Sequence, residues 1–168
     1  MSALIGTLVG NPRPASRTLN AALALREAVK RVLPGSEDGA VVDAADLAQD
    51  LFTPGSTKVK DALASLELAN VLVIASPTYK ATYTGLLKLF LDQFGAGELG
   101  QIPTFPLMLG GSLAHALAPE LTLRPVLVEI GASVPAPSLY LLDSNYETSP
   151  ELDAWLEVAR RHVPGAAR

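Results

Sequence analysis

Short apolar runs alternate with amphipathic segments along the chain. Glycine, proline or small polar residues bound the apolar runs, which is typical of buried strands. The run VLVIA at 71–75 is β-branched and apolar throughout, so it suits a central strand that is covered on both faces. The predicted strands are 3–9, a short one around Val41 and Val42, 71–75, 105–109, and one within 132–142 that two prolines interrupt.

Helices are predicted between these strands. A helix that begins at Ser16 or Thr18 and runs to about Val32 has apolar residues near helical spacing, and Pro34-Gly35 ends it. Residues 46–57 are predicted to be a loop with room for one helical turn. The other predicted helices are 59–68, 84–94, Ser112 to about Ile130 with breaks or kinks at Pro119 and Pro125, and 149–151 to about His162.

This alternation predicts an α/β fold, a parallel sheet with helices on both faces. The 168 residues contain no repeat and no internal linker, so we expect one domain, residues 1–168. Ligands of such folds bind beyond the carboxyl ends of the strands, at the switch point of the sheet. A site is therefore expected in the turns after the first, third and fourth strands, at 10–18, 76–85 and 110–115.

Composition excludes several classes of protein. The chain is 49% hydrophobic and 18% charged, which is not the composition of a disordered chain. It has no cysteine, and its two histidines, His115 and His162, are far apart, which argues against disulfides, thiolate chemistry and a transition-metal site. A net charge of -4 without a basic run argues against nucleic acid as a partner. No signal-peptide or membrane-span pattern is found, so we expect a cytoplasmic protein without a membrane partner.

The first turn, GNPRPASRT, has the features of a phosphate site. It leads into a helix N-terminus, where free N–H groups and the helix dipole favour an anion. The short side chains of Asn11, Ser16 and Thr18 add hydrogen-bond donors, and Arg13 and Arg17 add positive charge. The turn has neither the GxxxxGK[ST] nor the GxGxxG pattern, which disfavours nucleotide hydrolysis and a tightly held dinucleotide. A capped helix with two solvated arginines is the alternative interpretation.

The second turn, SPTYKATYTG, has groups that suit a flat redox-active ring. Pro77 fixes the backbone, while Thr78, Tyr79 and Lys80 offer backbone groups, an aromatic face and a cation. A flavin needs donors and acceptors along its pyrimidine edge and positive potential near its reduced form. The alternative is a plain loop whose tyrosines cover the core and whose lysine lies in water.

The third turn, GGSLAH, allows close backbone approach at Gly110 and Gly111. Ser112 can cap the following helix or donate to a ligand. His115 is given no proton-transfer role, because a lone histidine in a first helical turn is usually structural and hydride transfer to a flavin needs no protein acid.

In this order and spacing, the blocks GNPRPASRT, SPTYKATYTGLLKLFLDQF and GGSLAHAL…LRPVL resemble the NADPH-dependent FMN reductases, above all their sulfonate-utilisation branch, up to about Val128. The resemblance implies a flavodoxin-like fold whose five parallel strands have the order 2-1-3-4-5. It implies FMN and NADPH (or NADH) as cofactors, and a partner monooxygenase that receives reduced flavin. The implied FMN residues are Asn11, Arg13, Ser16, Arg17 and Thr18 at the phosphate, Pro77, Thr78, Tyr79 and Lys80 at the ring, and Gly110, Gly111 and Ser112 on its other side.

Two questions about the flavin and its acceptor stay open. In the sulfonate branch, a tyrosine inserted in the fourth helix is tied to flavin release, and the aligned segment 117–122 has no tyrosine. The alternatives are therefore a quinone or azo-dye reductase with tightly held FMN, a flavodoxin-type electron carrier, and a fold that has lost its flavin. The basic residues of the turns suit a nicotinamide phosphate better than a basic protein partner.

A second copy of the chain is also expected. The segment 84–94 is apolar over most of its circumference, which predicts a homodimer or homotetramer in which two copies of this helix meet. The alternative is a helix that is covered within its own chain.

Overall fold

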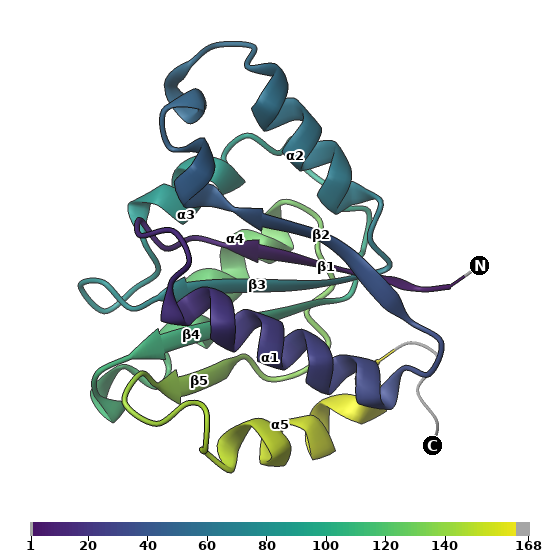
Figure 1. Cartoon of the computed structure of the whole chain (residues 1–168), viewed down its shortest axis with the longest axis vertical. Coiled ribbons are helices and arrows are strands. Elements are labelled where there is room, and N and C mark those ends of the chain that lie inside the picture. Colours follow the sequence, from purple (N-terminus) through teal and green to yellow (C-terminus); the bar gives the residue numbers. More distant parts are fainter. Residues whose placement is uncertain (1, 164–168) are drawn as a thin grey trace.

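The structure, a computed structural model, describes residues 2–163. Its five strands are all parallel and form one sheet in the order β2-β1-β3-β4-β5 (Figure 1). This confirms the predicted flavodoxin-like fold. The strands are β1 (Leu4–Val9), β2 (Glu37–Asp43), β3 (Val71–Pro77), β4 (Thr104–Gly110) and β5 (Leu139–Leu142).

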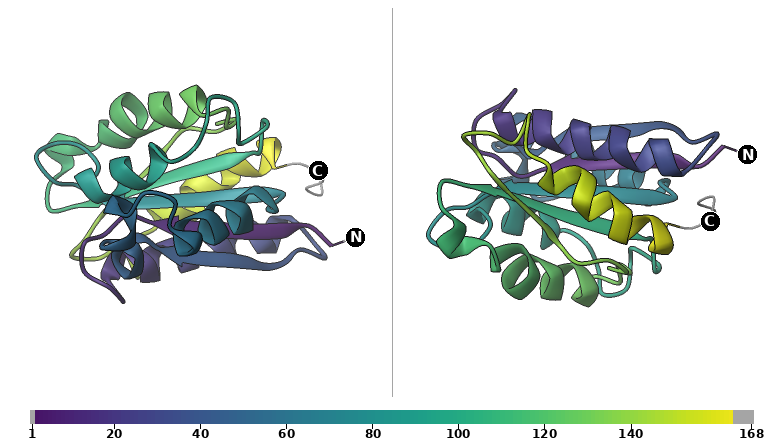
Figure 2. Two further views of the ribbon diagram at one scale, coloured as in Figure 1. Left: turned by 90° about the horizontal axis from the view of Figure 1, so that it is seen from above. Right: turned by 90° about the horizontal axis from the view of Figure 1, so that it is seen from below.

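Helices cover both faces of the sheet, as predicted (Figure 2). On one face, α1 (Arg17–Val32) and α5 (Glu151–Ala159) pack over one apolar cluster. On the other face, α2 (Thr57–Glu67), α3 (Gly85–Leu91) and α4 (Arg124–Glu129) pack over a second cluster. Because all five strands are parallel, their carboxyl ends lie at the same edge of the sheet.

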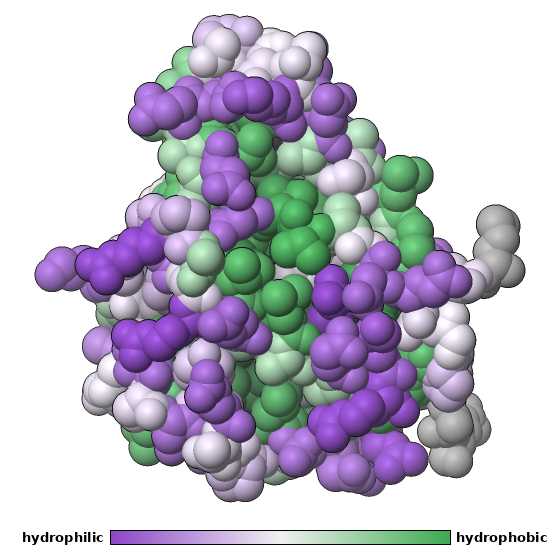
Figure 3. All heavy atoms as spheres, viewed as in Figure 1, coloured by the Kyte–Doolittle hydropathy of each residue, from purple (hydrophilic) through white to green (hydrophobic). Residues whose placement is uncertain are grey.

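The alternation of side chains along β3 divides the core into these two clusters. Val71, Val73 and Ala75 face the α1 side, while Leu72 and Ile74 face the α3 side. All five residues are at most 1% exposed, as expected for a central strand covered on both faces. In Figure 3, apolar side chains reach the surface between α1 and α2, over the edge of the sheet, and hydrophilic residues flank them.

The predicted helix from Ser112 to Ile130 is not continuous. It begins with a 3₁₀ turn at Leu113–His115, passes through a π-helical segment at Pro119–Leu123, and becomes α-helical only in α4. Pro125 has no N–H with which to close the regular ladder, and the N–H of Arg124 donates to the carbonyl of Pro119, five residues back. Pro119 begins the π-helical segment and Pro125 lies in the first turn of α4, so the helix type changes at both prolines, where breaks or kinks were expected.

Other boundaries differ from the prediction. The last strand keeps only β5, because the prolines at 135 and 137 remove ladder donors from the segment before it. β2 is longer than its two valines suggested. α3 is shorter than predicted at both ends, since Thr84 is its N-cap and Leu91 its last residue.

Most apolar residues of α3 are buried within their own chain. Leu87, Phe90 and Leu91 are fully buried, and Leu86 and Leu89 are partly buried against the same cluster. Burial within its own chain therefore accounts for the apolar pattern of α3 without a second copy of the protein. Separately, no helix of the described residues is long and apolar enough to cross a membrane.

Candidate functional site

The turns after β1, β3 and β4 surround one cavity of about 350 Å³, which we call the rim cavity. Among the predicted site residues, all but Lys80 and Ser112 line it. The turns meet because parallel strands bring their carboxyl ends to the same edge. The lining consists of Asn11, Arg13, Pro14, Ala15, Ser16, Arg17, Thr18, Pro77, Thr78, Tyr79, Leu109, Gly110, Gly111 and Asp143.

Internal hydrogen bonds hold the first turn in shape. The Asn11 side chain accepts from the N–H of Arg13 at 2.9 Å and donates to the hydroxyl oxygen of Thr18 at 3.0 Å. Ser16 caps α1 by accepting from the N–H of Leu19 at 3.2 Å. Asn11 and Thr18 are thus buried and shape the loop. The helix N-terminus and the two arginines are the groups that can meet an anion.

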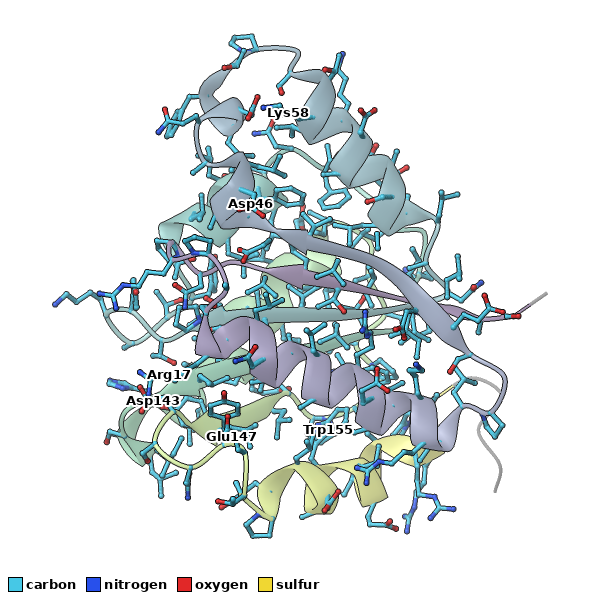
Figure 4. The ribbon with its side chains drawn as sticks, in the orientation of Figure 1. Arg17, Asp46, Lys58, Asp143, Glu147 and Trp155 are labelled. Atoms are coloured by element: carbon cyan, nitrogen blue, oxygen red, sulfur yellow. The ribbon has the colours of Figure 1, made fainter. Side chains whose placement is uncertain are left out.

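Arg17 contacts Asp143, which lies 126 residues later in the sequence. Its guanidinium donates to the backbone carbonyl of Asp143 at 3.1 Å and to the Asp143 carboxylate at 3.4 Å. The two side chains lie together in Figure 4, beside the start of α1. Asp143 follows β5 directly, and its N–H donates to the carbonyl of Gly110 at 3.0 Å. A residue that sequence analysis did not select therefore joins the first and third turns.

The second turn is held in a strained conformation. Tyr79 and Thr82 exchange two backbone hydrogen bonds, of 2.8 and 3.2 Å, around Lys80 and Ala81. Both central residues are left-handed, with φ of 52° and 66°, although neither is glycine. Tight turns of this kind usually use glycine or asparagine, and strain of this sort concentrates at functional sites. The turn leaves Tyr79 half-exposed at the rim cavity and Lys80 exposed outside its lining.

Thr84 connects the first two turns. Its hydroxyl donates to the carbonyl of Gly10 and accepts from the N–H of Leu87 at 3.1 Å, and its own N–H donates to the Ser76 hydroxyl at 3.0 Å. A Cβ on Gly10 would lie 2.3 Å from the Cβ of Leu87, so only glycine allows this approach. The sequence could indicate Thr84 as a helix cap, because it precedes an apolar run. It could not indicate the hydrogen bond from Thr84 to Gly10.

The third turn is fixed from below by Tyr140 of β5. A Cβ on Gly110 would lie 2.0 Å from the Tyr140 hydroxyl, which occupies that space and donates to the carbonyl of Ser112 at 2.7 Å. A Cβ on Gly111 would meet nothing within 4 Å. The Ser112 hydroxyl caps the following turn by accepting from the N–H of Ala114, and it lies outside the lining.

The hydroxyl of Thr78 is buried and has no hydrogen-bond partner. It lies 3.0 Å from the position of a Cβ on Gly110, at the junction of the second and third turns. A buried hydroxyl without a partner is unfavourable, so a ligand that pairs with it gains a strong interaction. The cavity thus combines an anion-binding helix end with two arginines, an aromatic side chain and an open glycine, and Thr78, whose buried hydroxyl has no partner, is part of its lining. This set fits a phosphorylated flavin.

A 2-1-3-4-5 parallel sheet with a ligand cavity at its switch point defines a flavodoxin-like protein. Residues 3–147 match the family model described as NADPH-dependent FMN reductase, and the chain belongs to this family. The family predicted from the three turns is thereby confirmed.

Individual relatives agree with the family. The "FMN reductase (NADPH)" of Escherichia coli (strain K12) is 39% identical over 77 residues, which are 46% of this chain and 40% of that protein. The protein of the same name from Pseudomonas aeruginosa (strain PAO1) is 33% identical over 122 residues, 70% of this chain and 64% of its own. The chain thus spans between two fifths and two thirds of the length of these relatives.

A solved structure resembles the chain over nearly its full length. The apo form of an NADH:FMN oxidoreductase (EMOB) superposes with a TM-score of 0.83 at 30% identity, covering 96% of this chain and 88% of that one. A flavodoxin from the domain Archaea, at 14% identity and a TM-score of 0.61, shares the fold.

Proposed function

We propose that this chain is an NAD(P)H-dependent FMN reductase that transfers a hydride from reduced nicotinamide to FMN. The observation that carries the proposal is the convergence of three turns on one cavity with an anion-binding end and a partnerless hydroxyl. Its volume of about 350 Å³ lies within the range of small-molecule sites. The family membership supports the same activity.

The first turn would hold the FMN phosphate. Arg13 and Arg17 supply positive charge, and Ser16 and Thr18 stand where α1 presents its first N–H groups. Asn11 would act by holding the loop, because both ends of its side-chain amide bond within the turn. Little reorganisation is then needed when the anion arrives.

The second and third turns would hold the flavin ring. Pro77, Thr78 and Tyr79 of the second turn and Gly110 and Gly111 of the third turn all line the cavity. FMN, when bound, supplies the redox chemistry, while the protein orients it and excludes water. Lys80 and Ser112 lie beside the cavity. In this proposal, Lys80 contributes positive potential at the mouth, and Ser112 contributes backbone that Tyr140 holds in place.

We also propose that residues 1–168 form a single FMN-binding domain. In this proposal the protein works in the cytoplasm and supplies reduced flavin to a flavin-dependent monooxygenase. A homodimer or homotetramer is supported by four apolar side chains that are 53–67% exposed along residues 113–129, which we call the fourth-helix segment. These four side chains are Leu113, Leu117, Leu121 and Val128.

A second candidate is a reductase that keeps its FMN and passes electrons to a quinone or an azo dye. The observation that favours it is the π-helical segment at Pro119–Leu123, which contains no tyrosine, although the sulfonate-utilisation branch ties flavin release to a tyrosine in this helix.

One experiment tests the activity and separates the two candidates. Oxidation of NADPH or NADH is followed at 340 nm with purified protein, first with a quinone or an azo dye alone and then with added free FMN. Dependence on free FMN identifies flavin as a substrate, and turnover without it identifies a resident cofactor. Failure to oxidise either nucleotide under both conditions refutes the proposed function.

A further inference from the structure

Asp143 is an acidic residue in a cavity whose other charges are positive. Among the lining residues that the structure describes, Arg13, Arg17 and Asp143 are charged, and Asp143 alone carries a negative charge. A carboxylate beside a phosphate site opposes the ligand that the site attracts. Its presence therefore needs a physical explanation.

The backbone fixes the position of this carboxylate. The N–H of Asp143 donates to the carbonyl of Gly110 at 3.0 Å, and its own carbonyl accepts from Arg17 at 3.1 Å. Both contacts use main-chain atoms, so they persist whatever side chain stands at position 143. The carboxylate makes only the third contact, a 3.4 Å ion pair with Arg17, and it is 37% exposed. Exposed ion pairs of this length contribute little to stability, so the carboxylate is not needed to hold the turn.

The carboxylate instead acts on the charge of the cavity. It neutralises part of the Arg17 charge that a phosphate would meet, and it repels the phosphate directly. Because the carboxylate is partly exposed, water screens this repulsion, and in water-like surroundings Coulomb's law gives roughly a several-fold change in affinity for a dianion. A ligand without a phosphate does not experience it.

We infer that Asp143 is a specificity-determining residue that weakens the binding of the flavin phosphate and so keeps FMN exchangeable. The inference rests on the proposed FMN-binding function. The charge opposition lowers the selectivity of the cavity for phosphorylated over unphosphorylated flavin. A reductase that hands its flavin to another protein benefits from such moderate affinity.

The test is the substitution Asp143→Asn, which keeps the shape of the side chain and both main-chain contacts. Dissociation constants for FMN and for riboflavin are measured by quenching of flavin fluorescence. We expect FMN to bind about 5- to 10-fold more tightly to the variant at low ionic strength, and riboflavin to change less than about 2-fold. The gain for FMN should shrink when salt is raised to roughly 0.5 M.

The matched control is Glu147→Gln. Glu147 lies in the same loop and lines the neighbouring hollow with Arg17 and Asp143, but not the rim cavity (Figure 4). Its substitution removes the same charge from outside the cavity lining and should tighten FMN binding less than about 2-fold, well below the gain in Asp143→Asn. Unchanged or weaker FMN binding to Asp143→Asn, or an equal gain for riboflavin, overturns the inference while the proposed function stands. A wild-type chain that binds no FMN overturns both.

Discussion

The hydroxyl of Tyr140 donates to the backbone carbonyl of Ser112 at 2.7 Å, across 28 residues of sequence. This bond fixes the third turn from the side of β5. The Tyr140 hydroxyl occupies the space that a side chain at Gly110 would need. Tyr140 is thus a positioning residue, which shapes the cavity without lining it.

Removing this hydroxyl should loosen the third turn. In Tyr140→Phe we expect a loss of stability of about 1 kcal/mol, because the Ser112 carbonyl loses its partner. FMN should bind about 3- to 10-fold more weakly, since the turn must then be ordered on binding. Visible circular dichroism of the bound flavin reports the change in its surroundings. Tyr83→Phe, outside the rim cavity, is the control, and an unchanged flavin spectrum in Tyr140→Phe would refute the positioning role.

Thr78 should show opposite effects on stability and binding. Replacing its partnerless buried hydroxyl with a methyl group, as in Thr78→Val, should stabilise the ligand-free protein by about 1 kcal/mol and raise its Tm by roughly 2–4 °C. FMN binding should weaken about 5- to 10-fold, because the hydrogen bond to the ligand is lost. Thr78→Ser should keep wild-type affinity. A Thr78→Val protein that binds FMN as the wild type does would show that the hydroxyl does not meet the ligand.

The backbone of Ala81 is strained, because this residue is left-handed although it is not glycine. Ala81→Gly should stabilise the protein by about 1 kcal/mol, because glycine adopts positive φ without the Cβ clash. The control Ala64→Gly, at an exposed position within α2, should destabilise by about the same amount. Urea unfolding measures both. Two changes of the same sign would contradict the assignment of strain to the second turn.

The sequence alone could predict much of this arrangement. The apolar runs and their glycine and proline boundaries located every strand, and the order of the turns located the cavity. The sequence could not predict contacts between residues that are far apart in the chain. Arg17 looked like a free cation, because its partner Asp143 lies 126 residues away. Lys80, which is predicted at the ring, lies outside the lining of the rim cavity, and nothing local in the sequence indicates the left-handed turn that places it there.

The contacts of Glu120 with Arg124 and Ser138 should make the free energy of unfolding decrease at acid pH. Glu120 accepts from the N–H of Ser138 at 2.9 Å and from Arg124 at 2.8 Å, which ties the loop before β5 to the fourth-helix segment. Burial alone would raise the pKa of Glu120, but the hydrogen bond from the N–H of Ser138 and the charge of Arg124 outweigh it and lower the pKa below its usual 4.5.

A lowered folded-state pKa means that this contribution is present above about pH 4.5 and is lost as the pH falls through the folded value. In Glu120→Gln we expect less loss of unfolding free energy between pH 6 and pH 3 than in the wild type. The difference should stay below about 1 kcal/mol, because 37% of the side chain is exposed. Equal pH profiles for the two proteins would contradict this role.

The bond from Thr84 to Gly10 has a consequence for how a ligand enters and leaves. Ser76 bonds to the N–H of Thr84, and Thr84 bonds to Gly10, so the end of β3, the start of α3 and the start of the first turn are tied together. The walls proposed for the ring and for the phosphate are therefore linked through one residue. A ligand that spans both turns would meet them at a spacing that these bonds already hold.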